Sequence, residues 1–201
     1  RELPAAVTQA LKPIGQGRIG ADYSSFVNCL DAAFERALAA HAERAARSGA
    51  RSREVIDWLT AQAAVFQNCA AGPLVLPAPA AFDADVLVKA DRDYHTAAAY
   101  FYATQYDEAA GRFRAIASNT MSPWRTSGRY LAARALIRSV TVPTSAPKDL
   151  AQRFAAAERD LQATLADRDA VALHPSARGL LDLVAARARP VARLHQLSSR
   201  L

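Results

Sequence analysis

Four histidines and two cysteines are among the residues in this chain whose chemistry suits metal binding or nucleophilic attack. They are His41, His95, His174, His195, Cys29 and Cys69. Zinc sites place their ligands at short, regular spacings such as CxxC or HExxH, and neither motif occurs here. Nothing next to either cysteine supplies the base that a nucleophilic thiol needs. We therefore expect no metal site and no catalytic Cys–His pair.

A glycine-rich string and three pairs of carboxylates could also bind a cofactor or take part in catalysis, but their surroundings favour structural roles. Residues 15–20 read GQGRIG, the string of a dinucleotide-binding loop, yet Pro13 precedes them and no strand–helix–strand unit follows. The pairs are Asp83/Asp85, Asp91/Asp93 and Asp107/Glu108. Each lies at or near a predicted helix start, where negative charge favours the helix dipole. The sequence thus predicts no cofactor and no enzymatic activity.

The elements that carry these residues are predicted to be helices. Alanine supplies 48 of 201 residues and is the strongest helix former, whereas β-branched residues are sparse. Periodicity, caps and prolines predict helices at about 29–47, 53–69, 83–104, 107–118, 123–140, 148–166, 175–188 and 190–200. Residues 1–27 read as an extended lead-in, and the chain as a mature or excised piece because it begins at Arg1. We expect one all-α domain at 28–201, with Pro-rich linkers at 71–82 and 141–147.

Part of this helical region resembles the tetratricopeptide repeat family. The resemblance is carried by the runs Tyr100-x5-Tyr106-Asp107-Glu108-Ala109-x3-Phe113-x2-Ile116 and Trp124-x3-Gly128-x2-Leu131. It covers about a third of the chain and departs from the family pattern at Ala97, where Gly is favoured, and at Met121, where Pro is favoured. The resemblance implies a right-handed α-solenoid of about four antiparallel helix pairs. An ordinary helical bundle is the alternative fold.

The resemblance also implies a binding surface, because the inner face of the first helix of such repeats binds peptides. This face maps onto Tyr94 and Tyr102, and in the next repeat onto Arg125 and Arg129. Tyrosines beside arginines suit an acidic peptide or a C-terminal carboxylate. An alternative role for the tyrosines is contact with the Pro-rich linker at 73–82. The predicted function is a non-enzymatic scaffold or a protein- or peptide-binding module, whose partner and oligomeric state the sequence leaves open.

The alternative function is a basic module that binds nucleic acid. The net charge is +6, and 22 of the 25 basic residues are arginines. Against this function, acidic residues are interspersed among the basic ones, and no block of like charge occurs. No apolar run is long enough to span a membrane.

The spacing of Cys29 and Cys69 predicts a disulfide. The first two helices are expected to form an antiparallel hairpin whose turn is centred near residue 49, and both cysteines lie 20 positions from it. Residues equally distant from the turn lie side by side, within reach of a disulfide. A disulfide indicates an oxidising compartment, which for a bacterial chain is most simply the periplasm or the exterior. Free cysteines would instead indicate the cytoplasm.

Overall fold

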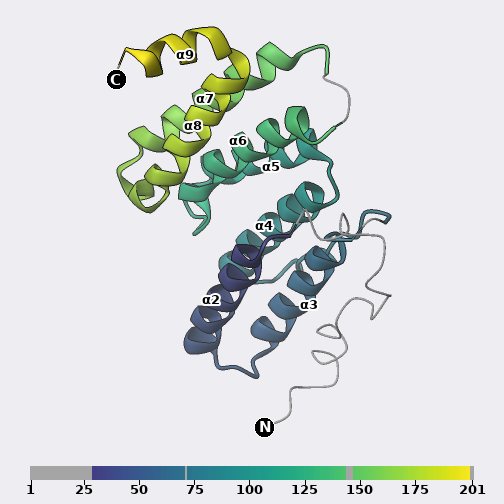
Figure 1. Ribbon diagram of the computed structural model, residues 1–201. Coiled ribbons are helices and arrows are strands. Elements are labelled where there is room, and N and C mark those ends of the chain that lie inside the picture. The colour runs from purple at the N-terminus through teal and green to yellow at the C-terminus, as the bar shows by residue number, and fades with distance from the viewer. Residues whose placement is uncertain (1–28, 71, 144–146, 200–201) are drawn as a thin grey trace. The chain divides into compact units, whose positions relative to one another are not determined.

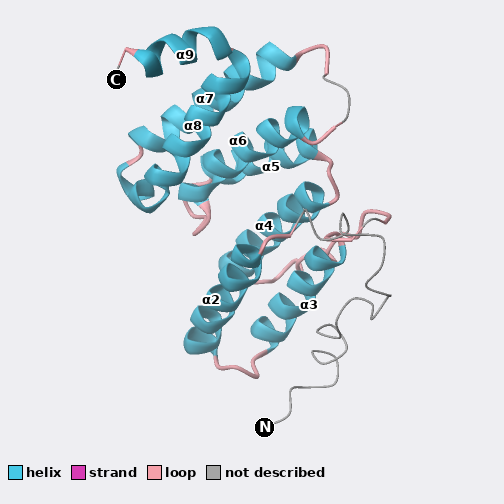
Figure 2. Cartoon of the chain, in the orientation of Figure 1, coloured by secondary structure: helices cyan, strands magenta, loops and turns pink. Residues whose placement is uncertain are grey.

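A computed structural model describes residues 29–70, 72–143 and 147–199, and all regular structure in these ranges is helical (Figures 1 and 2). The elements are α2 (Asp31–Ser48), α3 (Arg53–Gln67), α4 (Val86–Tyr102), α5 (Tyr106–Ser118), α6 (Arg125–Thr141), α7 (Leu150–Ala166), the 3-10 helix η2 (Arg168–Leu173), α8 (His174–Ala188) and α9 (Pro190–Ser198). The predicted all-α class is confirmed. The lead-in predicted at 1–27 and the glycine string lie outside the described residues.

The helices belong to two compact units, with the boundary between Gln105 and Tyr106. This boundary was not predicted, because it falls inside the run that resembles a repeat. Unit 1 contains α2, α3 and α4, and unit 2 contains α5 to α9.

Side-chain caps fix several of the predicted helix ends. Ser52 Oγ accepts a hydrogen bond from the backbone N–H of Val55 at 3.2 Å and so begins α3. Ser122 Oγ accepts from the N–H of Trp124 at 3.2 Å, but α6 begins only at Arg125. The predicted start at residue 123 is therefore two residues early, because Ser122 caps the turn that precedes the helix.

In unit 1, α3 packs against both α2 and α4 (Figure 1). It buries an apolar stripe at helical spacing, formed by Val55, Trp58, Ala61 and Val65. By contrast, α2 fully buries Ala40 alone among its 18 residues. The outer helix of this unit therefore contributes little to the core and keeps most of its surface uncovered.

Two cross-links hold the open end of the α2–α3 hairpin. Cys29 and Cys69 form the predicted disulfide, with their Cα atoms 5.4 Å apart and both residues buried. Beside it, the buried side chain of Asn68 accepts a hydrogen bond from the N–H of Val75 and donates one to the carbonyl of Val75, both at 2.8 Å. The disulfide fastens α2 to α3, and Asn68 orders the start of the Pro-rich linker.

In unit 2, each helix packs against the next one along the chain. Helices α5 and α6 approach closely at Gly128, where an added Cβ would lie 2.6 Å from the carbonyl oxygen of Phe113 and 2.7 Å from the nitrogen of Ala117. Ala109 and Phe113 of α5 are also buried. The small residues in the run that resembles a repeat thus let the two backbones come together.

A buried carboxylate joins three helices of unit 2. Asp160 of α7 accepts hydrogen bonds from Nε and Nη2 of Arg114 on α5, at 3.0 and 2.7 Å. Arg129 of α6 lies 3.8 Å from its other oxygen. Only 7% of the Asp160 side chain is exposed, so the two guanidinium groups compensate its charge within the protein.

Candidate functional site

The two tyrosines predicted to bind a peptide lie on α4 and are half-buried. Tyr94 and Tyr102 pack against a buried cluster of unit 1, and Leu74 of the Pro-rich linker packs against the same cluster. The members of this cluster are Val65, Ala98 and Ala99. Part of each tyrosine therefore serves the packing of α3, α4 and the linker, and the rest faces solvent.

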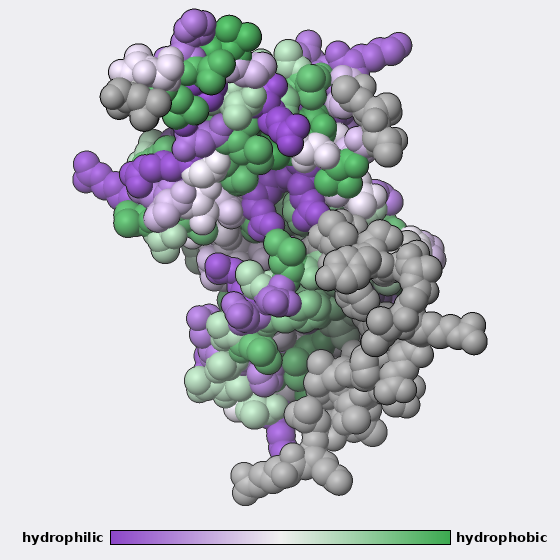
Figure 3. Space-filling view, viewed as in Figure 1, coloured by the Kyte–Doolittle hydropathy of each residue, from purple (hydrophilic) through white to green (hydrophobic). Residues whose placement is uncertain are grey.

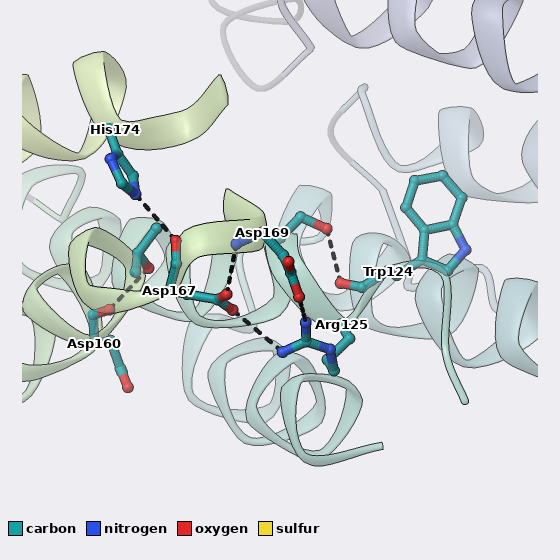
Figure 4. A network of polar contacts seen from close by, with 8 residues as sticks. Trp124, Arg125, Asp160, Asp167, Asp169 and His174 are labelled. Atoms are coloured by element: carbon teal, nitrogen blue, oxygen red, sulfur yellow. Dashed lines mark hydrogen bonds and ion pairs between the residues drawn. The ribbon is translucent and has the colours of Figure 1, made fainter. Parts of the chain in front are cut away.

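The two arginines predicted to bind the peptide lie in unit 2 and form ion pairs there. Arg125 contacts Asp167 at 3.2 Å and Asp169 at 2.6 Å (Figure 4). The backbone carbonyl of Asp167 lies 3.2 Å from Nε2 of His174 in the same network. Arg129 pairs with Asp160, as described above. Both arginines therefore already hold carboxylates, and Arg125 ties the start of α6 to η2.

A cavity of about 230 Å³ lies among α2, α3 and α4 and was not predicted from the sequence. Its polar lining includes Arg44 and Arg47 of α2, Trp58 of α3, and Arg92 and His95 of α4. A sequence signal for it exists in α4. Polar residues at 91 and 95 continue the helical stripe that residues 98 and 99 bury in the core. Polar side chains on a core-facing stripe mark a site where the interior is not purely apolar.

Two ion pairs organise the cavity wall. Arg44 donates from Nε and Nη2 to the two oxygens of Asp91, at 2.6 and 2.5 Å, and its guanidinium lies 5.6 Å from the ring centre of Trp58. Arg92 donates from Nη2 to Asp57 at 2.7 Å. These contacts join α2 to α4 and α4 to α3. They also fix the side chains that face the cavity.

Three residues that line the cavity also carry buried side-chain atoms without a hydrogen-bond partner among the described residues. These are Nε1 of Trp58, Nε of Arg92 and both ring nitrogens of His95. His95 is 1% exposed, and its ring centre lies 5.3 Å from that of Trp58. Burial, followed by the nearby charges of Arg92 and Arg44, lowers the pKa of His95 from 6.5 to about 3. His95 is therefore neutral, with one N–H donor and one acceptor nitrogen.

Helix α2 presents an exposed apolar stripe. Leu30 just before the helix, Phe34 and Leu38 are spaced four residues apart and are 59%, 41% and 70% exposed. Phe34 also stacks on Phe66 of α3, with ring centres 4.5 Å apart, which fixes the stripe relative to the hairpin. Figure 3 shows hydrophobic residues among hydrophilic ones on this part of the surface. A row of exposed large apolar side chains is typical of protein-binding surfaces.

A second exposed apolar row lies on α9. It consists of Val191, Leu194 and Leu197, which are 69%, 68% and 46% exposed. No residue of α9 is fully buried. Unlike the stripe on α2, this row is not held in place by a disulfide or by an aromatic contact within the described residues.

Other features of the described residues narrow the possible kinds of site. They contain no group of three or more His, Cys, Asp or Glu side chains arranged to hold a metal ion. None of the described helices combines the length and the hydropathy that a membrane crossing requires. Comparison with known proteins finds no matching family model, no matching curated protein and no matching solved structure.

Proposed function

We propose that this chain is a non-enzymatic helical module that binds a protein partner through the apolar stripe of α2. The observation that carries the proposal is the exposure of Leu30, Phe34 and Leu38 along a helix in which Ala40 alone is fully buried. An amphipathic helix of the partner, laid along this stripe, would cover the side chains at their four-residue spacing.

Rigid attachment of α2 supports this role. The disulfide holds one end of the helix, and the ion pair between Arg44 and Asp91 holds the other. A preorganised surface loses little conformational entropy when it binds, so a larger part of the contact energy appears as affinity.

The groove predicted around Tyr94, Tyr102, Arg125 and Arg129 stays a prediction. We place the partner on α2 because the two arginines are already paired with carboxylates, whereas the side chains of the apolar stripe are exposed. The same consideration argues against nucleic acid as the partner. Nine arginines form ion pairs within the described residues, namely Arg44, Arg92, Arg112, Arg114, Arg125, Arg129, Arg153, Arg189 and Arg193.

We further propose that the helices form a right-handed solenoid of tetratricopeptide-like pairs in the bacterial periplasm or exterior. The stacking of each helix in unit 2 on the next, and the close contact at Gly128, support the repeat-like architecture. The disulfide between Cys29 and Cys69 supports an oxidising compartment.

Site-specific photo-crosslinking in the native cells tests the docking surface. A photoreactive residue is placed at Leu38, on the stripe, or at Ala39, which is exposed but lies 100° around the helix. The proposal predicts a discrete protein adduct from position 38 and a much weaker one from position 39. Equal labelling from the two positions, or no adduct from either, would contradict it.

A further inference from the structure

The last described helix of unit 2, α9, turns its polar side toward its own unit. Arg193 donates a hydrogen bond from Nη2 to a carboxylate oxygen of Asp182 on α8, at 2.6 Å. Arg189, the residue just before α9, donates from its two Nη atoms to both oxygens of Glu158 on α7. These two ion pairs set the rotation of α9 about its own axis.

This rotation leaves the apolar row of α9 facing outward. At about 100° per residue, Leu194 lies about 100° and Val191 about 160° around the helix from Arg193. Every residue of α9 except Arg193 is exposed, so the helix stands out from the unit along its length. Amphipathic helices of globular proteins normally bury their apolar side against the core. The reversed arrangement in α9 presents that side to something outside the unit.

The charge of unit 2 indicates what kind of surface this is. The unit contains 15 basic and 8 acidic residues, a net charge of +7, whereas unit 1 contains 10 and 11, a net charge of −1. Helix α9 carries no acidic residue, and Arg187 is exposed in the last turn of α8. The negative charges beside α9, on Asp182 and Glu158, are neutralised by the ion pairs described above. A second copy of this unit would therefore be repelled, and an anionic surface attracted.

A bilayer that contains anionic phospholipids matches both the charge and the apolar row. Its headgroups attract basic residues, and its acyl chains cover apolar side chains. An amphipathic helix lies in the plane of this interface with its apolar side about 5–10 Å deep, which is less than its own diameter of about 10–12 Å. Because α9 stands out from unit 2, it can reach this depth without rearrangement of the helices below it. Nucleic acid is also anionic, but its phosphate backbone offers no apolar cover for the row.

We propose that α9 attaches unit 2 reversibly to the surface of a bilayer that contains anionic phospholipids. Val191, Leu194 and Leu197 lie among the upper parts of the acyl chains, and the net positive charge of unit 2 attracts the headgroups. The helix lies on the bilayer and does not cross it. The proposal concerns unit 2, so it does not depend on a partner docking on the α2 stripe of unit 1.

Co-sedimentation with lipid vesicles tests the proposal. The full chain is mixed with vesicles of pure phosphatidylcholine, or of phosphatidylcholine and phosphatidylglycerol in equal parts. We expect at least tenfold tighter binding to the anionic vesicles. This binding should weaken at least tenfold when NaCl is raised from about 0.05 M to about 0.5 M, because salt screens the attraction. No binding to the anionic vesicles, or equal binding to the two compositions, would overturn the proposal.

Two neutral substitutions test whether α9 is the element that binds. Leu194→Gln removes the apolar side chain at the centre of the row, and Ala192→Gln places the same residue at an exposed position about 160° around the helix. Neither changes the charge, and both should keep the urea midpoint of the parent because both positions are at the surface. We expect at least fivefold weaker binding to anionic vesicles for Leu194→Gln and less than a twofold change for Ala192→Gln. Equal affinities for the two variants would overturn the assignment to α9.

A photoreactive residue at Leu194 separates a lipid surface from an acidic protein as the occupant. The proposal predicts lipid adducts from this position in the native cells. A discrete protein adduct, together with no binding of the purified chain to anionic vesicles, would assign the row to a protein partner and overturn the proposal.

Discussion

Replacing Gly128 by alanine tests the close packing of α5 against α6. The new Cβ would lie 2.6 Å from the carbonyl oxygen of Phe113, 2.7 Å from the nitrogen of Ala117 and 2.8 Å from its Cβ. Ordinary contacts between such atoms are near 3.5 Å, so the helices must separate by roughly 1 Å at this point. Two of the three opposing atoms belong to the backbone, and no side-chain rotation relieves them.

The magnitude follows from two opposing effects. Overpacking of this kind costs about 1–3 kcal/mol or more, and separating the helices also loosens contacts around the fully buried alanines at 132, 133 and 135. Against this, alanine is better than glycine in a helix by about 1 kcal/mol. We expect Gly128→Ala to lower the free energy of unfolding of unit 2 by about 2 kcal/mol.

Gly111→Ala is the matched control, because Gly111 is an exposed residue of α5 with nothing within 4 Å of the added Cβ. It should raise stability by about 0.5–1 kcal/mol. Urea unfolding is followed by the fluorescence of Trp124 in a Trp58→Phe background, so that the signal comes from unit 2. If Gly128→Ala is as stable as Gly111→Ala, the close approach of α5 and α6 is refuted.

Three further predictions concern stability. Reducing the disulfide between Cys29 and Cys69, which are 40 positions apart, should lower the free energy of unfolding of unit 1 by about 4 kcal/mol. The loss should be seen as a lower urea midpoint. Two thiols that react in the folded protein without reductant would contradict the disulfide. His95 takes up a proton in the unfolded chain below pH 6.5 but in the folded chain only near pH 3. The free energy of unfolding should therefore fall by about 1.4 kcal/mol for each unit by which the pH is lowered from 6.5 towards 3. This part of the slope, measured by urea unfolding at several pH values, should vanish in His95→Phe and persist in His195→Phe. Asp160→Asn should lower the free energy of unfolding of unit 2 by about 2 kcal/mol in the Trp124 assay. A change below about 0.5 kcal/mol would show that the charge of Asp160 does not hold Arg114 and Arg129 in place.

Most of the helices could be predicted from the sequence, because their signals are local. Caps such as Ser52, the prolines of the linkers and the spacing of apolar residues place the ends of the helices within a few residues. The disulfide was predictable for a related reason, since a hairpin turn relates Cys29 to Cys69 by symmetry. The short helix η2 was missed, because its start depends on Asp167, whose carboxylate also binds the distant Arg125.

The cavity was not predicted, because its parts come from three separate helices. Arg44 and Asp91 are 47 positions apart, and no local pattern relates them. Nor does a sequence show that Arg125 is already paired with carboxylates of its own unit. The exposure of Leu38 was not predicted either, because an apolar residue four positions after Phe34 in a helix usually faces a core. The residues around it instead pack so sparsely that only Ala40 is fully buried.

The affinity of the partner for two matched variants tests the docking surface on α2 most directly. Leu38→Asp places a charge on the stripe, and Ala39→Asp places the same charge on another exposed face of the same helix. Both positions are at the surface, so both variants should unfold within about 0.5 kcal/mol of the parent. With the partner captured at position 38, we expect at least tenfold weaker binding for Leu38→Asp and less than a twofold change for Ala39→Asp. Equal affinities for the two variants would contradict the proposal that the partner docks on this stripe.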